Sequence, residues 1–168
     1  MPQARPRATV SIDAPLDTVW DVMTDVAAYA EWNPFVYLVE CPVPPHPGDA
    51  LVLHVRWANG RTSVSPERIS AVEPPYDDAG TRRATLAYVY EGLPARFGLV
   101  RGVRHQRLSQ VAGGATVYDT VEEFSGPLVA LAGPGRVAEG FRRHAQALKA
   151  RCEGGPEDRG SPWPRPRR

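Results

Sequence analysis

The chain has 168 residues and a formal net charge of +1, with 42% apolar and 23% charged residues. This length fits one globular domain with a sizeable core, and the balanced charge gives no reason to expect nucleic acid as a partner. No apolar run approaches the roughly 20 residues that span a bilayer, and the polar Met1 to Arg7 segment is unlike a secretory signal. Cys41 and Cys152 form neither a disulfide framework nor a metal-binding spacing, so we expect reduced thiols in a cytoplasmic protein.

The N-terminal part of the chain predicts a strand followed by two short helices. Arg7 to Asp13 alternates apolar and polar residues, as a half-buried strand does. Pro15 favours the first turn of a helix that carries an apolar stripe. A second short helix is expected over Val26 to Trp32, because the Asn33-Pro34 dipeptide disfavours helical backbone at its end.

The middle of the chain predicts antiparallel strands. They are expected over Phe35 to Cys41, Asp49 to Trp57, Arg61 to Glu73 and Thr81 to Glu91. Asn59-Gly60 suits a hairpin turn, since both residues tolerate positive φ, and Pro66 indicates a sheet edge or a bulge. We expect loops over Pro74 to Gly80 and, around Pro94, over Gly92 to Gly98.

The last third predicts a hairpin and a long helix. Leu99 to Val111 and Ala115 to Phe124 flank the turn residues 112–114. The final helix is expected to start at Ser125-Gly126-Pro127, to break at Gly133-Pro134-Gly135 and to run to Cys152. The residues at helical spacing that should face the sheet are Val137, Phe141, Ala145, Leu148 and Cys152.

These elements predict an α+β fold. About seven strands would form a curved antiparallel sheet around the long C-terminal helix, with two short helices beside it and a cavity enclosed between sheet and helix. We divide the chain into a flexible N-terminus (1–6), one ligand-binding domain (7–152) and a tail rich in Pro and Arg (153–168) that we expect to be disordered.

Three parts of the chain resemble the START-like, or SRPBCC, superfamily. They are Val10 to Pro15 with Val19 to Val22, Trp32 to Phe35, and Gly113 to Thr116 with Glu122 to Gly126. The resemblance covers roughly residues 7–152 and implies the helix-grip fold of pollen-allergen proteins and bacterial polyketide cyclases. It specifies the fold more than the chemistry, because the superfamily includes lipid carriers, hormone receptors and cyclases.

Polar residues on the inner face of the last predicted hairpin are expected to line the cavity, and three of them, Arg104, Tyr118 and Glu122, are the candidate catalytic groups. Strand parity from Leu108 and Phe124 predicts which residues face inward: Arg104, Gln106, Tyr118, Thr120 and Glu122. A turn at residues 112–114 would set Arg104 opposite Glu122 as a desolvated pair. If the register slips by one residue, Arg104 points to water instead, and Glu122 has an equally plausible structural role at the helix start.

Aromatic side chains supply the candidate ligand contacts. Trp57, Tyr88 and Tyr90 would line the pocket wall, and Phe141 would face it from the helix. Flat rings stack on a polycyclic or phenolic ligand, and Tyr hydroxyls give directed hydrogen bonds. The alternative interpretation is an ordinary aromatic core. With Gln106 and Thr120 these residues complete the predicted ligand-binding set.

The resemblance implies two classes of function. One is an aromatase/cyclase-like enzyme that needs no cofactor: Arg104 would act as an electrostatic clamp on a carbonyl, while Tyr88, Tyr118 or Glu122 moves protons. The other is a non-enzymatic carrier or sensor of a lipid or hydrophobic metabolite, with a partly vestigial cavity as a third reading. The expected partner is a small hydrophobic ligand, bound by a monomer or homodimer. The four scattered His residues show no metal-ligand spacing, and no nucleophile elbow, P-loop or dinucleotide motif is present.

Overall fold

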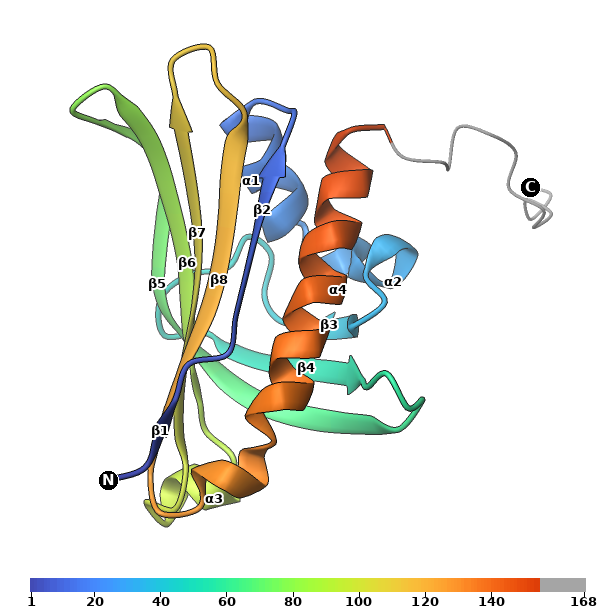
Figure 1. Cartoon of the computed structure of the whole chain (residues 1–168), viewed down its shortest axis with the longest axis vertical. Helices are drawn as coiled ribbons and strands as arrows, with labels where there is room; N and C mark the ends of the chain where they lie inside the picture. The colour runs from blue at the N-terminus through green and yellow to red at the C-terminus, as the bar shows by residue number, and fades with distance from the viewer. Residues whose placement is uncertain (155–168) are drawn as a thin grey trace, which may run out of the picture.

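The computed structural model describes residues 1–154, which form one curved sheet closed over a long helix (Figure 1). The predicted tail lies outside the described residues from position 155 on. The elements in chain order are β1 Gln3–Ala4, β2 Arg7–Ile12, α1 Leu16–Thr24, the 3-10 turn η1 Val26–Ala28, α2 Tyr29–Trp32, β3 Val36–Glu40, β4 Ala50–Arg56, β5 Thr62–Asp78, β6 Thr81–Tyr90, α3 Leu93–Arg96, β7 Arg101–Val111, β8 Thr116–Ser125, the 3-10 turn η2 Val129–Ala132 and α4 Pro134–Cys152.

The strands form a single antiparallel sheet. Its order is β1-β8-β7-β6-β5-β4-β3, and β2 pairs with β8 beyond the end of β1. β5 shifts register against β6 after Ile69 and again after Glu73, and such bulges bend a strand. In Figure 1 the long strands β6 to β8 stand upright while β4 and the start of β5 cross the lower half of α4. This arrangement confirms the predicted helix-grip fold.

The helix α4 is the centre of the packing. The residues predicted to face the sheet are buried, with the exception of the half-buried Cys152: Val137, Phe141, Ala145 and Leu148. Gly140 lets the helix approach the Phe35 ring closely, because a Cβ at this position would come within 2.2 Å of the ring. At the other end of the molecule α1 buries Leu16, Val19 and Met23 completely in the core.

Two segments predicted as loops have regular structure. The loop expected over Pro74 to Gly80 is wrong, because β5 continues to Asp78 and turns only at residues 79–80. A register shift between Glu73 and Tyr76 accommodates the missing N–H groups of Pro74 and Pro75 without ending the strand. In the segment Gly92 to Gly98, the residues Leu93–Arg96 form the short helix α3, where Pro94 occupies the first turn and needs no N–H donor.

The N-terminal residues 1–6, which were predicted to be flexible, contribute a short strand. Gln3 and Ala4 pair with Ser125 and Phe124 at the end of β8. Further along, the carbonyl of Pro6 accepts a hydrogen bond from the backbone N–H of β8 at 3.0 Å. The hydrogen-bonding edge of β8 is therefore covered along most of its length.

Candidate functional site

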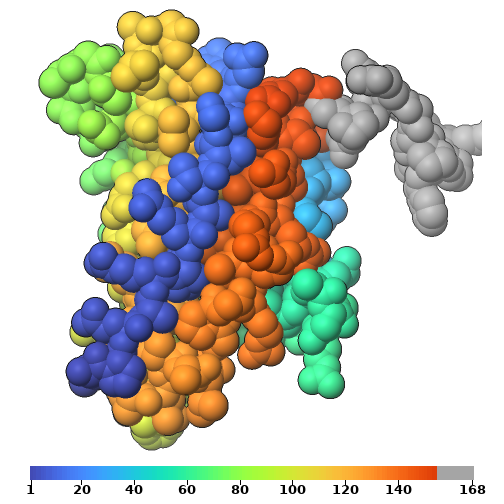
Figure 2. All heavy atoms as spheres, viewed as in Figure 1, coloured from blue at the N-terminus to red at the C-terminus, as the bar shows by residue number. Residues whose placement is uncertain are grey.

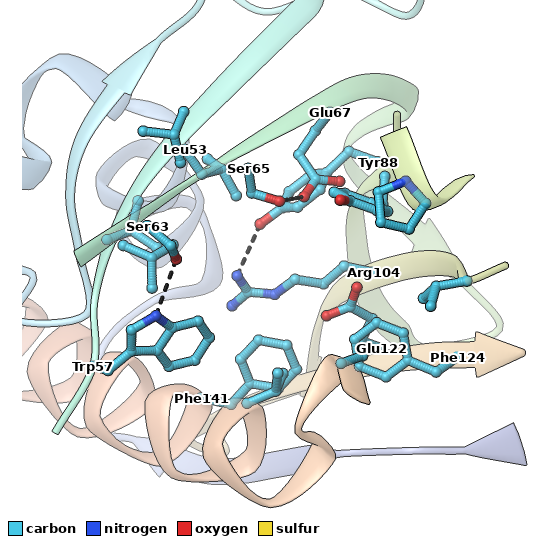
Figure 3. A pocket seen from close by; sticks show the side chains of 18 of the residues that line it. Leu53, Trp57, Ser63, Ser65, Glu67, Tyr88, Arg104, Glu122, Phe124 and Phe141 are labelled. Carbon is cyan, nitrogen blue, oxygen red and sulfur yellow. Dashed lines mark hydrogen bonds between the residues drawn. The ribbon is translucent and has the colours of Figure 1, made fainter. Parts of the chain in front are cut away.

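A cavity of about 400 Å³ lies between the sheet and the N-terminal half of α4. This volume is within the range of small-molecule pockets. Its wall is mostly apolar, and the ionisable side chains in it are those of Glu67, Tyr88, Tyr90, Arg104 and Glu122. Figure 3 shows several of these side chains directed into the same space. The interior is therefore hollow, as the sequence predicts, and aromatic residues do not fill it.

The mouth of the cavity lies between the β4–β5 hairpin and η2. Four of the lining residues are exposed apolar side chains, Val64, Leu99, Leu128 and Leu131. In Figure 2 the surface is hollowed between the start of α4 and this hairpin. Apolar residues at the entrance favour the partition of an apolar ligand from water into the cavity.

The structure brings most of the predicted site residues to the cavity wall. The lining includes six of the nine: Trp57, Tyr88, Tyr90, Arg104, Glu122 and Phe141. The other three, Gln106, Tyr118 and Thr120, are at most 1% exposed and lie behind the wall rather than in it. Tyr118 therefore has no direct access to a ligand in this cavity.

The predicted register of the last hairpin is confirmed. β7 and β8 pair Arg104 with Glu122, Gln106 with Thr120, and Leu108 with Tyr118. The alternative register, in which Arg104 points to water, is excluded, since Arg104 is only 4% exposed.

Arg104 is held by a network of neutral groups. Its Nε donates to Thr120 Oγ1 and its Nη1 donates to Tyr88 Oη, both at 2.9 Å. Its Cζ lies 4.1 Å from the centroid of the Phe141 ring, which gives a cation–π contact. Its Nη2 is buried and, among the described residues, has no hydrogen-bond partner. One nitrogen of a permanently charged, buried side chain in the cavity wall is thus without an acceptor from the protein.

The expected ion pair between Arg104 and Glu122 is not formed. No contact within 4.0 Å joins their charged atoms in the described part of the chain, although their Cα atoms are paired. The Glu122 carboxyl instead lies over Gly102, where an added Cβ would come within 2.6 Å of its Oε1. The guanidinium turns toward Thr120 and Tyr88 because their hydroxyls bind it directly.

Tyr118 and Gln106 support the wall from behind. Tyr118 Oη donates to Gln106 Oε1 at 2.6 Å, and Gln106 Nε2 donates to Tyr88 Oη at 3.4 Å. The Tyr88 hydroxyl therefore accepts from both Arg104 and Gln106, which orients its proton. Burial raises the pKa of Tyr88 well above its ordinary value, so the group remains a neutral phenol near neutral pH.

Sequence reasoning missed Glu67 on β5. This residue is 7% exposed, lines the cavity, and accepts a hydrogen bond from Ser65 Oγ at 2.6 Å. Burial raises the pKa of Glu67 to about 8, and burial likewise raises the pKa of Glu122 to about 7 against the opposing effect of Arg104. Glu67 lies two residues before the buried Ile69 and therefore on the same face of β5, which predicts that it points inward. Pro66 interrupts the strand pattern in the sequence and obscures this relation.

A second buried polar group, also missed, lies outside the cavity. Asn33 Nδ2 bonds His144 Nδ1 at 2.8 Å, while Asn33 Oδ1 accepts the N–H groups of Phe35 and Val36 at 3.0 Å. Since this oxygen is an acceptor, the amide nitrogen must be the donor, and His144 Nδ1 accepts. Burial lowers the pKa of His144 well below its ordinary value, so the ring is neutral and joins α4 to the start of β3.

Two other features are relevant to function. Within residues 1–154 no group of three or more His, Cys, Asp or Glu side chains is arranged to hold a metal ion. Within the same residues no helix combines the length and the apolar character needed to cross a membrane.

Solved structures share this fold at low sequence identity. The di-domain aromatase/cyclase BexL from the BE-7585A biosynthetic pathway matches with a TM-score of 0.68 and 16% identity, over 90% of this chain and 50% of that chain. The Zhui aromatase/cyclase from Streptomyces sp. R1128 matches with a TM-score of 0.68 and 21% identity, over 90% and 94%. A START superfamily protein from Mycobacterium smegmatis matches with a TM-score of 0.60 and 17% identity, over 89% and 97%. At these identities the likeness shows the fold alone.

Comparison at the level of sequence gives the family. Curated protein sequences yield no significant match. A family model described as polyketide cyclase / dehydrase and lipid transport matches residues 3–153, which is nearly the whole described chain. The helix-grip fold and the cavity under α4 agree with this match, and the chain belongs to the polyketide cyclase / dehydrase and lipid transport family.

Proposed function

We propose that the cavity binds a small hydrophobic or polycyclic metabolite and that the chain cyclises and dehydrates a polyketide-like substrate without a cofactor. The observation that carries this proposal is the buried Arg104 in the cavity wall, whose Nη2 donor has no hydrogen-bond partner among the described residues. A fold has no use for a buried cation with a free donor, because burying it costs free energy. A ligand oxygen at this position would satisfy that donor.

The chemistry that fits this wall is an intramolecular aldol closure. Trp57, Tyr90 and Phe141 would fold a flexible poly-β-ketone against flat apolar surfaces. Arg104 would polarise a carbonyl oxygen and stabilise the negative charge that develops on it, since a guanidinium is too weak an acid to give up its proton. Glu122, with its pKa near neutrality, would exchange the protons needed for water loss.

A non-enzymatic carrier or sensor is the second candidate function. The exposed apolar rim of Val64, Leu128 and Leu131 favours it, because such a rim suits the uptake and release of an apolar cargo. The polar cluster at Arg104 favours catalysis, because a pure carrier of apolar ligands gains nothing from a buried charge.

The test uses heptane-2,4,6-trione, which closes to orcinol and one water by a single aldol condensation. Purified protein is expected to accelerate orcinol formation, followed by liquid chromatography. Binding of the trione is expected to quench part of the tryptophan fluorescence, because Trp57 lines the cavity. Arg104→Met should lower the rate roughly 10- to 100-fold, since a charged hydrogen bond contributes about 1.5–3 kcal/mol. Arg101→Met, which removes an exposed guanidinium on the same strand, is the matched control.

The outcomes separate the two functions. Binding without turnover, together with an apolar compound that copurifies and is seen in native mass spectra, would support the carrier. Absence of both binding and a copurified compound would contradict the ligand-binding function itself. If Arg104→Met fails to fold, Arg104 is a structural residue.

A further inference from the structure

The Glu67 carboxyl has no structural explanation. It is almost fully buried, and its one hydrogen bond among the described residues comes from the small hydroxyl of Ser65. In the same part of the chain no Lys, Arg or His lies within ion-pair distance of it. Burying a carboxyl without a cation costs free energy, and a Gln or Leu of similar size would avoid that cost.

The position of Glu67 is that of a residue facing a ligand. It lies on β5 opposite Tyr90 of β6, and both side chains line the cavity. Figure 3 shows Glu67 directed into the same space as Arg104 and Glu122. An acceptor and a cationic donor thus border one apolar space from different strands.

We propose that Glu67 is a general base of this cavity, which removes a proton from a carbon acid while Arg104 Nη2 binds the oxyanion that forms. The ligand class is a molecule with an acidic C–H next to a carbonyl. The C–H bond breaks, its proton moves to a Glu67 oxygen, and its electron pair becomes an enolate whose oxygen accepts from Nη2. This inference rests on the proposed ligand-binding role of the cavity and deepens it.

The surroundings select Glu67 over the other groups in the wall. Tyr88 is a neutral phenol whose oxygen already accepts from Arg104 and Gln106. Glu122 lies over Gly102 on the neighbouring strand. The pKa of Glu67, which burial raises to about 8, makes its carboxylate a stronger base than an ordinary one while leaving an appreciable ionised fraction near neutral pH.

The test uses 5-nitrobenzisoxazole, an apolar probe unrelated to polyketides. A base removes the proton on its C3, the N–O bond breaks, and coloured 2-cyano-4-nitrophenolate is released with no further reactant. Wild-type protein should accelerate this release with a rate that rises with pH as Glu67 ionises, levelling above pH 8. Glu67→Gln should lower kcat/KM about 100-fold or more, as expected on removal of a general base.

Matched variants separate the base from general effects of the cavity. Glu73→Gln removes an exposed carboxyl on the same strand and should leave the rate unchanged. Arg104→Met should lower the rate and move the midpoint of the pH profile upward, since Arg104 holds the pKa of Glu67 down. A merely structural Arg104 would move the midpoint in the same way, because the charge is lost in either case, but it would not lower the plateau rate of a folded variant. Quenching of tryptophan fluorescence that is lost in Trp57→Phe reports binding of the probe in each variant.

Two results would overturn the inference in different ways. If the probe quenches Trp57 but Glu67→Gln retains the wild-type rate, or wild-type protein shows no rate, Glu67 is not the base and the ligand-binding role stands. If the probe neither binds nor reacts, the ligand-binding role fails and the inference fails with it. Circular dichroism of each variant ensures that a lost rate is not a lost fold.

Discussion

Two carboxyls of the cavity wall, the buried Glu67 and the half-buried Glu122, make stability depend on pH in an unusual direction. Each pKa unit between native and unfolded carboxyl is worth about 1.4 kcal/mol. A native pKa of about 8 for Glu67, against the ordinary 4.5, corresponds to about 5 kcal/mol lost once the group ionises. Glu122, at about 7, adds a further loss of roughly 3 kcal/mol. Losses of this size are a large fraction of the stability of a domain.

The direction follows from the number of bound protons. Between pH 4.5 and about 8 the native state holds the Glu67 proton that the unfolded state has released. The free energy of unfolding therefore falls as pH rises, by up to about 1.4 kcal/mol per pH unit for each such carboxyl. The stabilisation is fully present below pH 4.5 and is lost as pH rises through about 8 for Glu67 and about 7 for Glu122.

Glu67→Gln keeps the shape of the side chain and removes its ionisation. We expect this variant to be more stable than wild type at pH 8 by about 3–5 kcal/mol, a rise in Tm of roughly 10 °C for a domain of this size. The assay is urea unfolding followed by circular dichroism at pH 5, 6, 7 and 8, with Glu73→Gln as the control. If the free energy of unfolding changes with pH in the same way for wild type and Glu67→Gln, the reasoning is refuted, since Glu67 is then already ionised in the native state over this pH range.

Two further predictions concern the packing of α4. Gly140→Ala should lower the free energy of unfolding by about 1–2 kcal/mol, because its Cβ displaces the Phe35 ring. Gly135→Ala, which adds a Cβ in open space on the same helix, should be neutral or stabilising, and equal effects of the two variants in urea unfolding would contradict this packing. Asn33→Ala should cost about 3 kcal/mol or more in thermal unfolding, because it leaves two buried N–H groups and the His144 nitrogen without partners; a loss below about 1 kcal/mol would show that water replaces the amide.

The strand pattern predicts the fold well because period-2 alternation and short Gly turns determine register. The turn at residues 112–114 is sufficient to pair Arg104 with Glu122, as the structure confirms. Prolines account for the two loop predictions that fail. Pro74 and Pro75 suggest a loop, yet a bulge lets β5 continue, and this depends on the sheet around them rather than on local preference.

The site is predicted less completely, because parity tells which face a residue is on and not what it meets there. Arg104, Gln106 and Thr120 share the inner face, but only Arg104 reaches the cavity. The sequence also cannot show that Arg104 binds hydroxyls instead of Glu122, since both are within reach of a long side chain. Because β5 continues through Pro66, the same parity rule places Glu67 on the inner face with Ile69.

The helix α4 divides the molecule into a solid part and a hollow part. Its first half, with Val137 and Phe141, covers the cavity, while in its second half the inward-facing His144 and Leu148 are at most 1% exposed. Residues around the cavity can therefore change to fit other ligands, while the packed residues at the other end of α4 keep the domain folded. Selection for a different cargo should change the β4–β5 hairpin, η2 and the roof of α4 before it changes α1 or the Asn33 hydrogen bonds.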